Sequence, residues 1–194
     1  EPALSRSVCT LGLVPGELLQ TIAAGTRVQL GPDSWCVVPG AADWLTVFSH
    51  MVLHGSWMHI IGNMWFLWIF GNNVEDSLGH LRFAFFYVLC GLAAAGLQLL
   101  SSPGSPIPMV GASGAIGGVM GAYVMLYPRV RVEMLFWLGF YVTTFAIPAY
   151  WMLGYWFLVQ LLGGVGPPGG SGRGVACWAH VGGFVAGPLL VLLF

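Results

Sequence analysis

The chain contains four long stretches without a formally charged residue, and they limit its fold more than any other feature. They lie between Asp43 and Glu75, between Arg82 and Arg129, between Glu133 and Arg173, and after Arg173. A helix needs about 20 apolar residues to cross the hydrocarbon core of a bilayer, so each stretch has room for at least one crossing. Charged residues make up 7% of the chain, whereas soluble domains contain about 25%. The sequence therefore predicts an integral membrane protein.

The alternation of apolar stretches and polar turns predicts an all-α fold, a polytopic membrane helix bundle with five spans. The spans are expected at residues 57–74, 83–100, 113–127, 148–162 and 175–194. The third is short for a full crossing, so we expect it to begin below the membrane surface, at the foot of an inward loop. Residues 134–146 are apolar but interrupted and are expected along the interface. Residues 163–174, which are rich in glycine, predict a flexible loop.

Residues 1–53 are expected to form an extramembrane first loop and residues 54–194 the five-span bundle, within a single membrane domain. Charges, prolines and glycines scattered through residues 1–43 leave no room for a spanning helix there. The chain starts with Glu1 and not with methionine, which predicts that it is cut from a longer protein. Cys9 and Cys36 both lie in this loop. A disulfide between them is compatible with an oxidising compartment, although nothing in the sequence requires one.

Composition argues against several classes of function. The net charge is −1, and the six arginines form no basic cluster and are accompanied by no lysine. This argues against a nucleic-acid partner and against a polybasic lipid anchor. His50 and His54 raise the alternative of a metal or haem site together with His59, but no HExxH motif or neighbouring carboxylate accompanies them. We therefore expect no metal and no cofactor.

Polar side chains of three predicted spans gather at one depth. Successive spans alternate in direction, so the first, third and fifth run the same way, and each has its polar residues near its start. These residues are His59 and Asn63, then Ser113, then His180. A serine among glycines is by itself explained more simply by close helix packing. Its companions favour a functional site, because lipid offers polar groups no hydrogen-bond partner and they usually face a cavity that serves function.

This set has the parts of a site built around a serine nucleophile. Ser113 opens a helix, so its amide is an unpaired donor at the positive end of the helix dipole. His59 and Asn63 are four residues apart, share a helix face and supply further donors for an oxyanion. His180 is the candidate general base, and because no acidic residue lies near, the unit is expected to be a dyad. His54 is expected to brace the loop before the helix.

At this point the chain resembles the rhomboid intramembrane serine proteases over nearly its whole length. The family's histidines and asparagine match His54, His59 and Asn63, its GxSG motif matches Gly111 to Gly114, its AHxxGxxxG motif matches Ala179 to Gly187, and its GxxxExxxG motif matches Gly71 to Gly79. The resemblance implies that Ser113 is the nucleophile and His180 the general base. It also implies an oxyanion hole formed by His59, Asn63 and the Ser113 amide. His54, Gly111 and Gly114 would support this site.

Three features depart from the family pattern. The helix that usually precedes the long first loop has no counterpart in residues 1–53. Many members have arginine after the loop tryptophan, where this chain has Leu45 after Trp44. Some members carry a tyrosine four residues after the serine, stacked on the histidine, and this chain has Gly117 there. The sequence therefore leaves the orientation of His180 unexplained.

By this resemblance the chain is expected to be an intramembrane serine endopeptidase that cleaves single-span membrane proteins in the lipid bilayer. The alternative is a catalytically silent relative that binds membrane proteins, although such a member need not keep both the serine and the histidine. Arg82, Arg129 and Arg131 lie at the end opposite the site, and Arg173 alone lies at the site end. The positive-inside rule then places the site on the non-cytoplasmic side, which we expect to be that of a bacterial inner membrane.

Glycines follow both candidate catalytic residues at helical spacing. Gly117 and Gly121 come four and eight residues after Ser113, and Gly183 and Gly187 come three and seven residues after His180. We expect the two stripes to face each other and to let the third and fifth spans approach closely, as small residues do in membranes. Gly118 is expected to point away from this contact.

Overall fold

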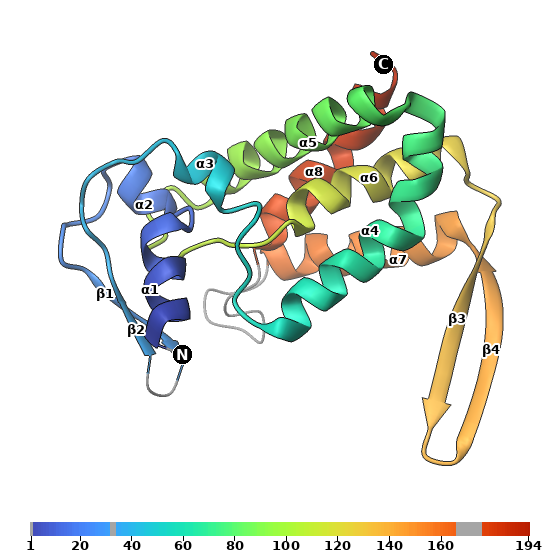
Figure 1. Ribbon diagram of the computed structural model, residues 1–194, viewed down its shortest axis with the longest axis horizontal. Coiled ribbons are helices and arrows are strands. Elements are labelled where there is room, and N and C mark those ends of the chain that lie inside the picture. The colour runs from blue at the N-terminus through green and yellow to red at the C-terminus, as the bar shows by residue number, and fades with distance from the viewer. Residues whose placement is uncertain (1, 32–33, 166–175) are drawn as a thin grey trace.

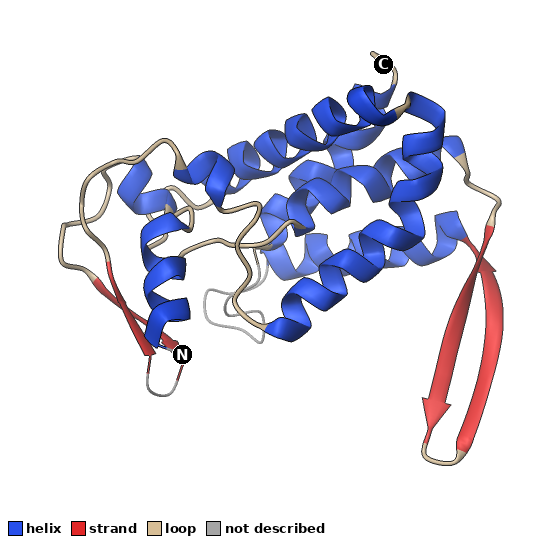
Figure 2. Ribbon diagram, viewed as in Figure 1, coloured by secondary structure: helices blue, strands red, loops and turns tan. Residues whose placement is uncertain are grey.

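The computed structural model describes residues 2–31, 34–165 and 176–194. Five long helices pack into a bundle, with a small N-terminal module at one end and a β-hairpin projecting from the other (Figures 1 and 2). The bundle consists of α4 (Trp57–Leu78), α5 (His80–Ser101), α6 (Ser113–Leu126), α7 (Ala149–Val165) and α8 (Cys177–Val191). The module contains α1 (Pro2–Leu11), α2 (Pro15–Leu18), β1 (Arg27–Gly31), β2 (Ser34–Val37) and α3 (Thr46–Ser49).

Helix α6 lies at the centre of the bundle. It contacts each of α4, α5, α7 and α8, and every residue from Ala115 to Tyr123 is buried. Large side chains from the neighbouring helices fill the space around it, among them Phe70, Phe86 and Leu153. The helix that begins at Ser113 is therefore the rigid element against which the others are placed.

The first two bundle helices meet more closely than the sequence predicted. We expected a polar turn over residues 75–82, but α4 continues through Leu78 and α5 begins at His80. Gly79 separates them with a φ of 81°, a left-handed conformation that glycine adopts without steric cost. Polar residues such as Glu75 are good helix formers at the end of a span, so the turn is reduced to the one residue that breaks the helix.

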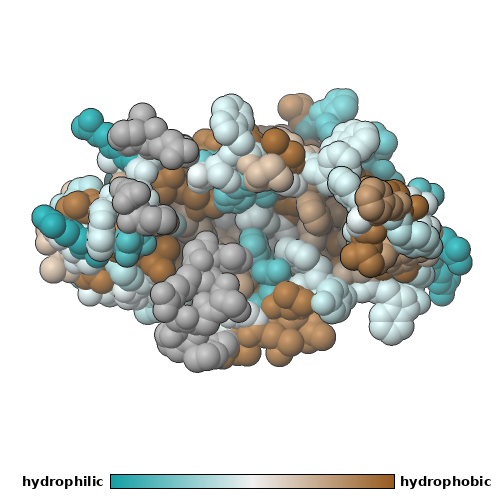
Figure 3. Space-filling model, turned by 90° about the horizontal axis from the view of Figure 1, so that it is seen from below, coloured by the Kyte–Doolittle hydropathy of each residue, from teal (hydrophilic) through white to brown (hydrophobic). Residues whose placement is uncertain are grey.

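The helices fit a membrane bundle, but their lengths differ. Judged by length and composition, α5 is the one described helix that is long and apolar enough to cross a membrane. Helices α6, α7 and α8 are apolar but shorter. The 14 residues of α6 span about 21 Å, against a hydrocarbon core of about 30 Å. Apolar side chains are exposed over the bundle, as on the face shown in Figure 3. The number of crossings remains a prediction.

The structure describes the two ends of the loop expected between the fourth and fifth spans, but not most of the loop itself. Helix α7 runs to Val165, three residues beyond the expected end of the fourth span, and α8 is described from Cys177. Most of the loop expected at residues 163–174 lies outside the described residues.

Residues 131–148 form a β-hairpin, so the all-α prediction was wrong in this respect. Strand β3 (Arg131–Leu138) pairs antiparallel with β4 (Tyr141–Pro148), and β1 pairs with β2 in a second, smaller hairpin. Gly139, with a φ of 58°, is the first residue of the two-residue loop, as a type II′ turn requires. Aromatic and β-branched residues favour strands. Apolar character alone does not reveal this preference.

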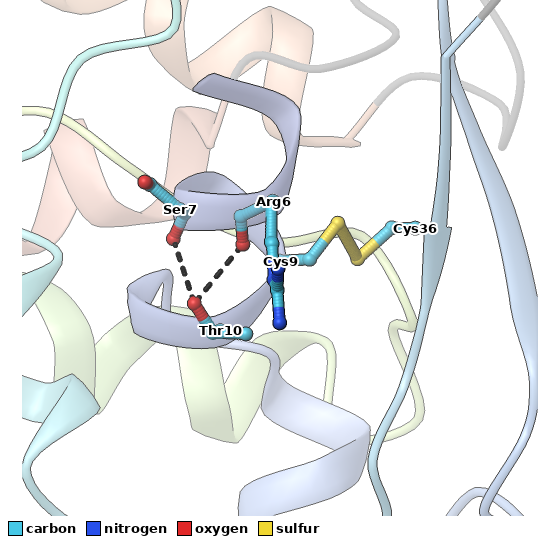
Figure 4. Close-up of a disulfide and its surroundings, with 5 residues drawn as sticks. All are labelled: Arg6, Ser7, Cys9, Thr10 and Cys36. Atoms are coloured by element: carbon cyan, nitrogen blue, oxygen red, sulfur yellow. Dashed lines mark hydrogen bonds between the residues drawn. A yellow bond between two sulfur atoms is a disulfide. The ribbon is translucent and has the colours of Figure 1, made fainter. Parts of the chain in front are cut away.

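The N-terminal module is fastened to the loop between α5 and α6. The backbone amides of Leu13 and Met109 each donate to the other's carbonyl oxygen, at 3.0 and 2.8 Å. A small apolar cluster of Leu13, Leu18 and Ala95 lies beneath this contact. A disulfide joins Cys9 on α1 to Cys36 on β2 (Figure 4). The disulfide that the sequence allowed is therefore present, at the end of the bundle where α6 begins.

Glycines let α6 and α8 approach closely. A Cβ atom on Gly183 would collide with the carbonyl oxygen of Gly114, and one on Gly187 with the carbonyl oxygen of Gly118. Gly121 lies against the backbone of α8. The two helices do approach closely, as expected, but the two stripes do not face each other. Gly183 and Gly187 lie against Gly114 and Gly118, whereas Gly117 and Gly121 lie against the backbone around Phe184.

The prediction for Gly118 was wrong. This glycine lies inside the contact, because a Cβ atom there would collide with the side chain of Cys90 on α5 and would lie 3.2 Å from the carbonyl oxygen of Gly183. The physical reason is that α6 packs on α5 and α8 at once, so the buried face of α6 is wider than one stripe. A pattern of spacings along one helix does not reveal how many neighbours that helix has.

Candidate active site

The structure brings Ser113 and His180 into hydrogen-bond contact. Ser113 is the first residue of α6, and His180 lies in the first turn of α8. The distance from Ser113 Oγ to Nε2 of His180 is 2.7 Å. The two residues are 67 positions apart in the chain, so the contact depends on the close packing of α6 against α8. This is the geometry that a serine nucleophile and its general base require.

Helix α7 supplies a partner for the other nitrogen of the His180 ring. Nδ1 of His180 lies 2.8 Å from Oε1 of Gln160. An amide oxygen only accepts hydrogen bonds, so Nδ1 carries the ring proton, and Nε2 is left with its lone pair directed at Ser113. Sequence reasoning missed Gln160. The available signal was a polar side chain in an otherwise apolar span, which is by default a candidate functional residue.

Trp156, one turn before Gln160 on α7, contacts the same imidazole. The ring centroids of Trp156 and His180 are 5.7 Å apart, at an interplanar angle of 44°. The indole also reaches Gly117, since a Cβ atom on that glycine would lie 3.7 Å from Cη2 of Trp156. An aromatic ring from α7 therefore lies next to His180 in a chain that has glycine at the position of the family's tyrosine. Nothing in the sequence connects Trp156 with His180.

The side chains of His59 and Asn63 lie next to Gly111, two residues before Ser113 in the chain. A Cβ atom on Gly111 would lie 2.7 Å from Nε2 of His59 and 3.5 Å from Nδ2 of Asn63. The φ of Gly111 is 119°, a conformation that favours glycine, and its amide donates to the carbonyl oxygen of His50 at 2.8 Å. This backbone turn places α4's polar side chains beside the start of α6.

Both α4 side chains have donors available. Nδ1 of His59 accepts from the amide of Gly55 at 3.4 Å, so the ring proton lies on Nε2, which faces Gly111. Asn63 is buried, and its Nδ2 has no hydrogen-bond acceptor among the described residues. A buried donor without a partner costs about 1–3 kcal/mol and calls for an explanation.

The other histidines have different surroundings. His54 packs edge-on against His59, with ring centroids 5.1 Å apart, and its ring nitrogens have no partner among the described residues. His50 is buried, with Nδ1 2.9 Å from the carbonyl oxygen of Thr46, and burial lowers the pKa of His50 from its usual value near 6.5. His80 is the first residue of α5, at the end of the bundle away from Ser113, and its Nδ1 lies 2.6 Å from Oε1 of Glu75.

A cavity of about 560 Å³ opens onto these groups. Its walls include His59, Asn63, Ser113, Trp156 and His180, together with apolar residues of α4, α5 and the loop before α6. Such a volume falls within the range of small-ligand sites, about 300–1,000 Å³. The described residues contain no group of three His, Cys, Asp or Glu side chains that could hold a metal ion.

Comparison with known proteins identifies the family of this chain. Residues 41–194 match the protein family described as Rhomboid domain. The chain belongs to the rhomboid family. A member of this family is an integral membrane protein, and the helical bundle described above is the rhomboid domain.

Named relatives of this rhomboid include plant and bacterial proteins. It is 35% identical over 101 residues to RHOMBOID-like protein 6, mitochondrial, of Arabidopsis thaliana, which is 52% of this chain and 32% of the relative. It is 31% identical over 150 residues to rhomboid protease GluP of Bacillus subtilis, which is 77% of this chain and 27% of the relative. A third relative, RHOMBOID-like protein 1 of Arabidopsis thaliana, is 32% identical over 149 residues, 76% of this chain and 34% of the relative. This rhomboid thus spans about a third or less of their lengths.

Proposed function

We propose that this rhomboid is a serine endopeptidase that cleaves membrane-protein segments within the bilayer, with Ser113 as nucleophile and His180 as general base. The observation that carries the proposal is the 2.7 Å contact between Ser113 Oγ and Nε2 of His180. The proton on Nδ1, held by Gln160, leaves the Nε2 lone pair free to accept the serine proton. The family and the protease among its relatives support the same assignment.

In the first step, Ser113 Oγ attacks the carbonyl carbon of the scissile peptide while Nε2 of His180 takes the serine proton. The carbonyl oxygen becomes an oxyanion. When the tetrahedral intermediate collapses, the bond to the amide nitrogen breaks and His180 donates its proton to the leaving amine. Water then attacks the acyl ester and gives its proton to His180. When this second tetrahedral intermediate collapses, the ester bond breaks, His180 returns the proton to Ser113 Oγ and the carboxylic acid is released.

The oxyanion is stabilised by donors from α4 and α6. Nδ2 of Asn63 and Nε2 of His59 face the Gly111 turn beside Ser113, and the Ser113 amide lies at the positive end of α6. An oxyanion that forms there provides the acceptor that the buried Nδ2 of Asn63 lacks among the described residues. Donors that are fixed before the charge develops make the largest contribution in acyl-transfer sites.

We place the site toward the non-cytoplasmic side of the membrane. The arginine distribution predicts this orientation. The Cys9–Cys36 disulfide lies in the module fastened to the start of α6, and disulfides persist in oxidising compartments. Relatives named as mitochondrial, such as RHOMBOID-like protein 6, mean that family membership does not identify the membrane, so a bacterial inner membrane is part of the proposal only.

The experiment that tests the proposal is labelling with a fluorophosphonate, followed by mapping of the modified residue, beside cleavage of a single-span substrate in detergent. We expect Ser113 to be labelled, and Ser113→Ala and His180→Ala to abolish cleavage while the protein stays folded. His80→Ala is the matched control, since this histidine is exposed at the start of α5, at the end of the bundle away from Ser113. Full cleavage by Ser113→Ala or His180→Ala would favour the alternative, a silent binder of membrane proteins.

A further inference from the structure

We infer that Gln160 is a positioning residue that holds His180 in the tautomer the reaction needs, so that the unit on this chain is Ser113, His180 and a neutral Gln160. The inference rests on the proposed function. It starts from the 2.8 Å contact between Oε1 of Gln160 and Nδ1 of His180, which continues the 2.7 Å contact from Nε2 to Ser113.

The two tautomers of a neutral imidazole differ in what they do at Ser113. With the proton on Nδ1, the ring donates to Gln160 and accepts from the serine hydroxyl, so Nε2 is ready to take the proton. With the proton on Nε2, the ring can only donate to the serine. The lone pair of Nδ1 would then face the oxygen of Gln160, which is also an acceptor. Gln160 therefore disfavours the unproductive tautomer, the role that a buried aspartate has in Ser-His-Asp triads.

The amide does this without adding a charge. The described residues include no carboxylate that contacts His180, and the nearest chain groups on α7 are an amide and an indole. An ionised carboxylate at this depth would be costly in a low-dielectric environment. A glutamine supplies the same acceptor oxygen and remains neutral throughout the reaction.

Trp156 fixes the plane in which this hydrogen bond forms. It lies four residues before Gln160 and therefore shares its helix face. Its ring contacts the imidazole of His180 and also Phe184, with centroid separations of 5.7 and 5.9 Å. One face of α7 thus sets both the tilt of the imidazole and the position of its proton.

The test compares Gln160→Met with Gln98→Met. Methionine keeps the length of the side chain and removes the amide acceptor. Gln98 is the matched control because its Oε1 also accepts a hydrogen bond from α8, from the amide of Ala179 at 3.2 Å, without contacting the imidazole. We expect Gln160→Met to lower kcat by about 10- to 100-fold, as loss of a supporting partner does at metal-bound histidines, with KM unchanged.

Nitrogen NMR of ¹⁵N-histidine-labelled protein, with His180→Ala used for assignment, reads the tautomer directly. We expect the Nδ1-protonated form of His180 in the unmodified chain and a mixture in Gln160→Met. An Nε2-protonated His180 in the unmodified chain would overturn the inference even where a variant fails to fold. So would equal losses of kcat in Gln160→Met and Gln98→Met. If Ser113 were not labelled by the fluorophosphonate, the proposed function itself would fail. That result can be told apart from a failure of the Gln160 inference, which is read from the His180 tautomer and from kcat.

Discussion

The glycine contact between α6 and α8 leads to a prediction whose size follows from the structure. In Gly183→Ala, the new Cβ atom would collide with the carbonyl oxygen of Gly114, the residue next to Ser113. Real Cβ contacts are essentially never shorter than 3.0 Å, so α8 must move away from the start of α6 by about 1 Å. Both colliding partners belong to helices, and neither is the end of a flexible side chain.

Such a shift falls directly on the catalytic hydrogen bond. His180 lies three residues before Gly183, so a displacement of about 1 Å lengthens the 2.7 Å contact between Nε2 and Ser113 beyond hydrogen-bond range. Misplacement of reacting groups by 1 Å costs roughly 10²-fold in rate. Overpacking in a well-packed core costs about 1–3 kcal/mol of stability. We therefore expect Gly183→Ala to lose about 10²-fold in kcat and to unfold at a lower temperature.

The matched control is Gly96→Ala on α5, where a new Cβ atom meets nothing within 4 Å. This change should leave kcat unaltered and stabilise the helix slightly, because alanine in a helix interior is favoured over glycine by about 0.5–1 kcal/mol. The assay is cleavage of a single-span substrate in detergent, with thermal unfolding measured on the same samples. Equal kcat in the two variants would refute the reasoning, and the loops would then have to hold the catalytic residues together.

Three further predictions concern the site and its surroundings. Asn63→Ala should lower kcat by about 10²- to 10³-fold, less than Ser113→Ala, and an unchanged rate would remove Asn63 from the oxyanion hole. Replacing Cys9 and Cys36, 27 residues apart, by serine should cost about 3–4 kcal/mol of module stability, seen as a lower unfolding temperature that reductant no longer affects. Burial lowers the pKa of His50, so its stabilising contribution is present above its unfolded value near 6.5 and is lost as the pH falls toward the folded value. His50→Gln should flatten the fall in unfolding temperature below about pH 6.5, and an identical pH profile in both proteins would exclude this role.

Several features of this rhomboid could be read from the sequence because lipid makes polar groups conspicuous. Ser113, His59, Asn63 and His180 were identified by their types and by their common depth, since alternating spans bring their starting ends to the same side. The structure brings Ser113 and His180 into contact and groups His59 and Asn63 beside them. A turn between the first two spans was also expected, at residues 75–82, and the structure reduces it to Gly79.

Tertiary structure alone decided how each helix is rotated about its axis and which neighbours it meets. Gly118 belongs to the buried face because α6 has both α5 and α8 beside it, which spacing along one helix does not disclose. Gln160 reaches His180 because α7 packs against the first turn of α8. Residues 131–148 form strands because β3 and β4 supply each other's backbone hydrogen bonds. This pairing exists only after the chain has turned at Gly139. Depth along a span is a property of the sequence, whereas rotation and pairing arise from contacts between segments that are distant in it.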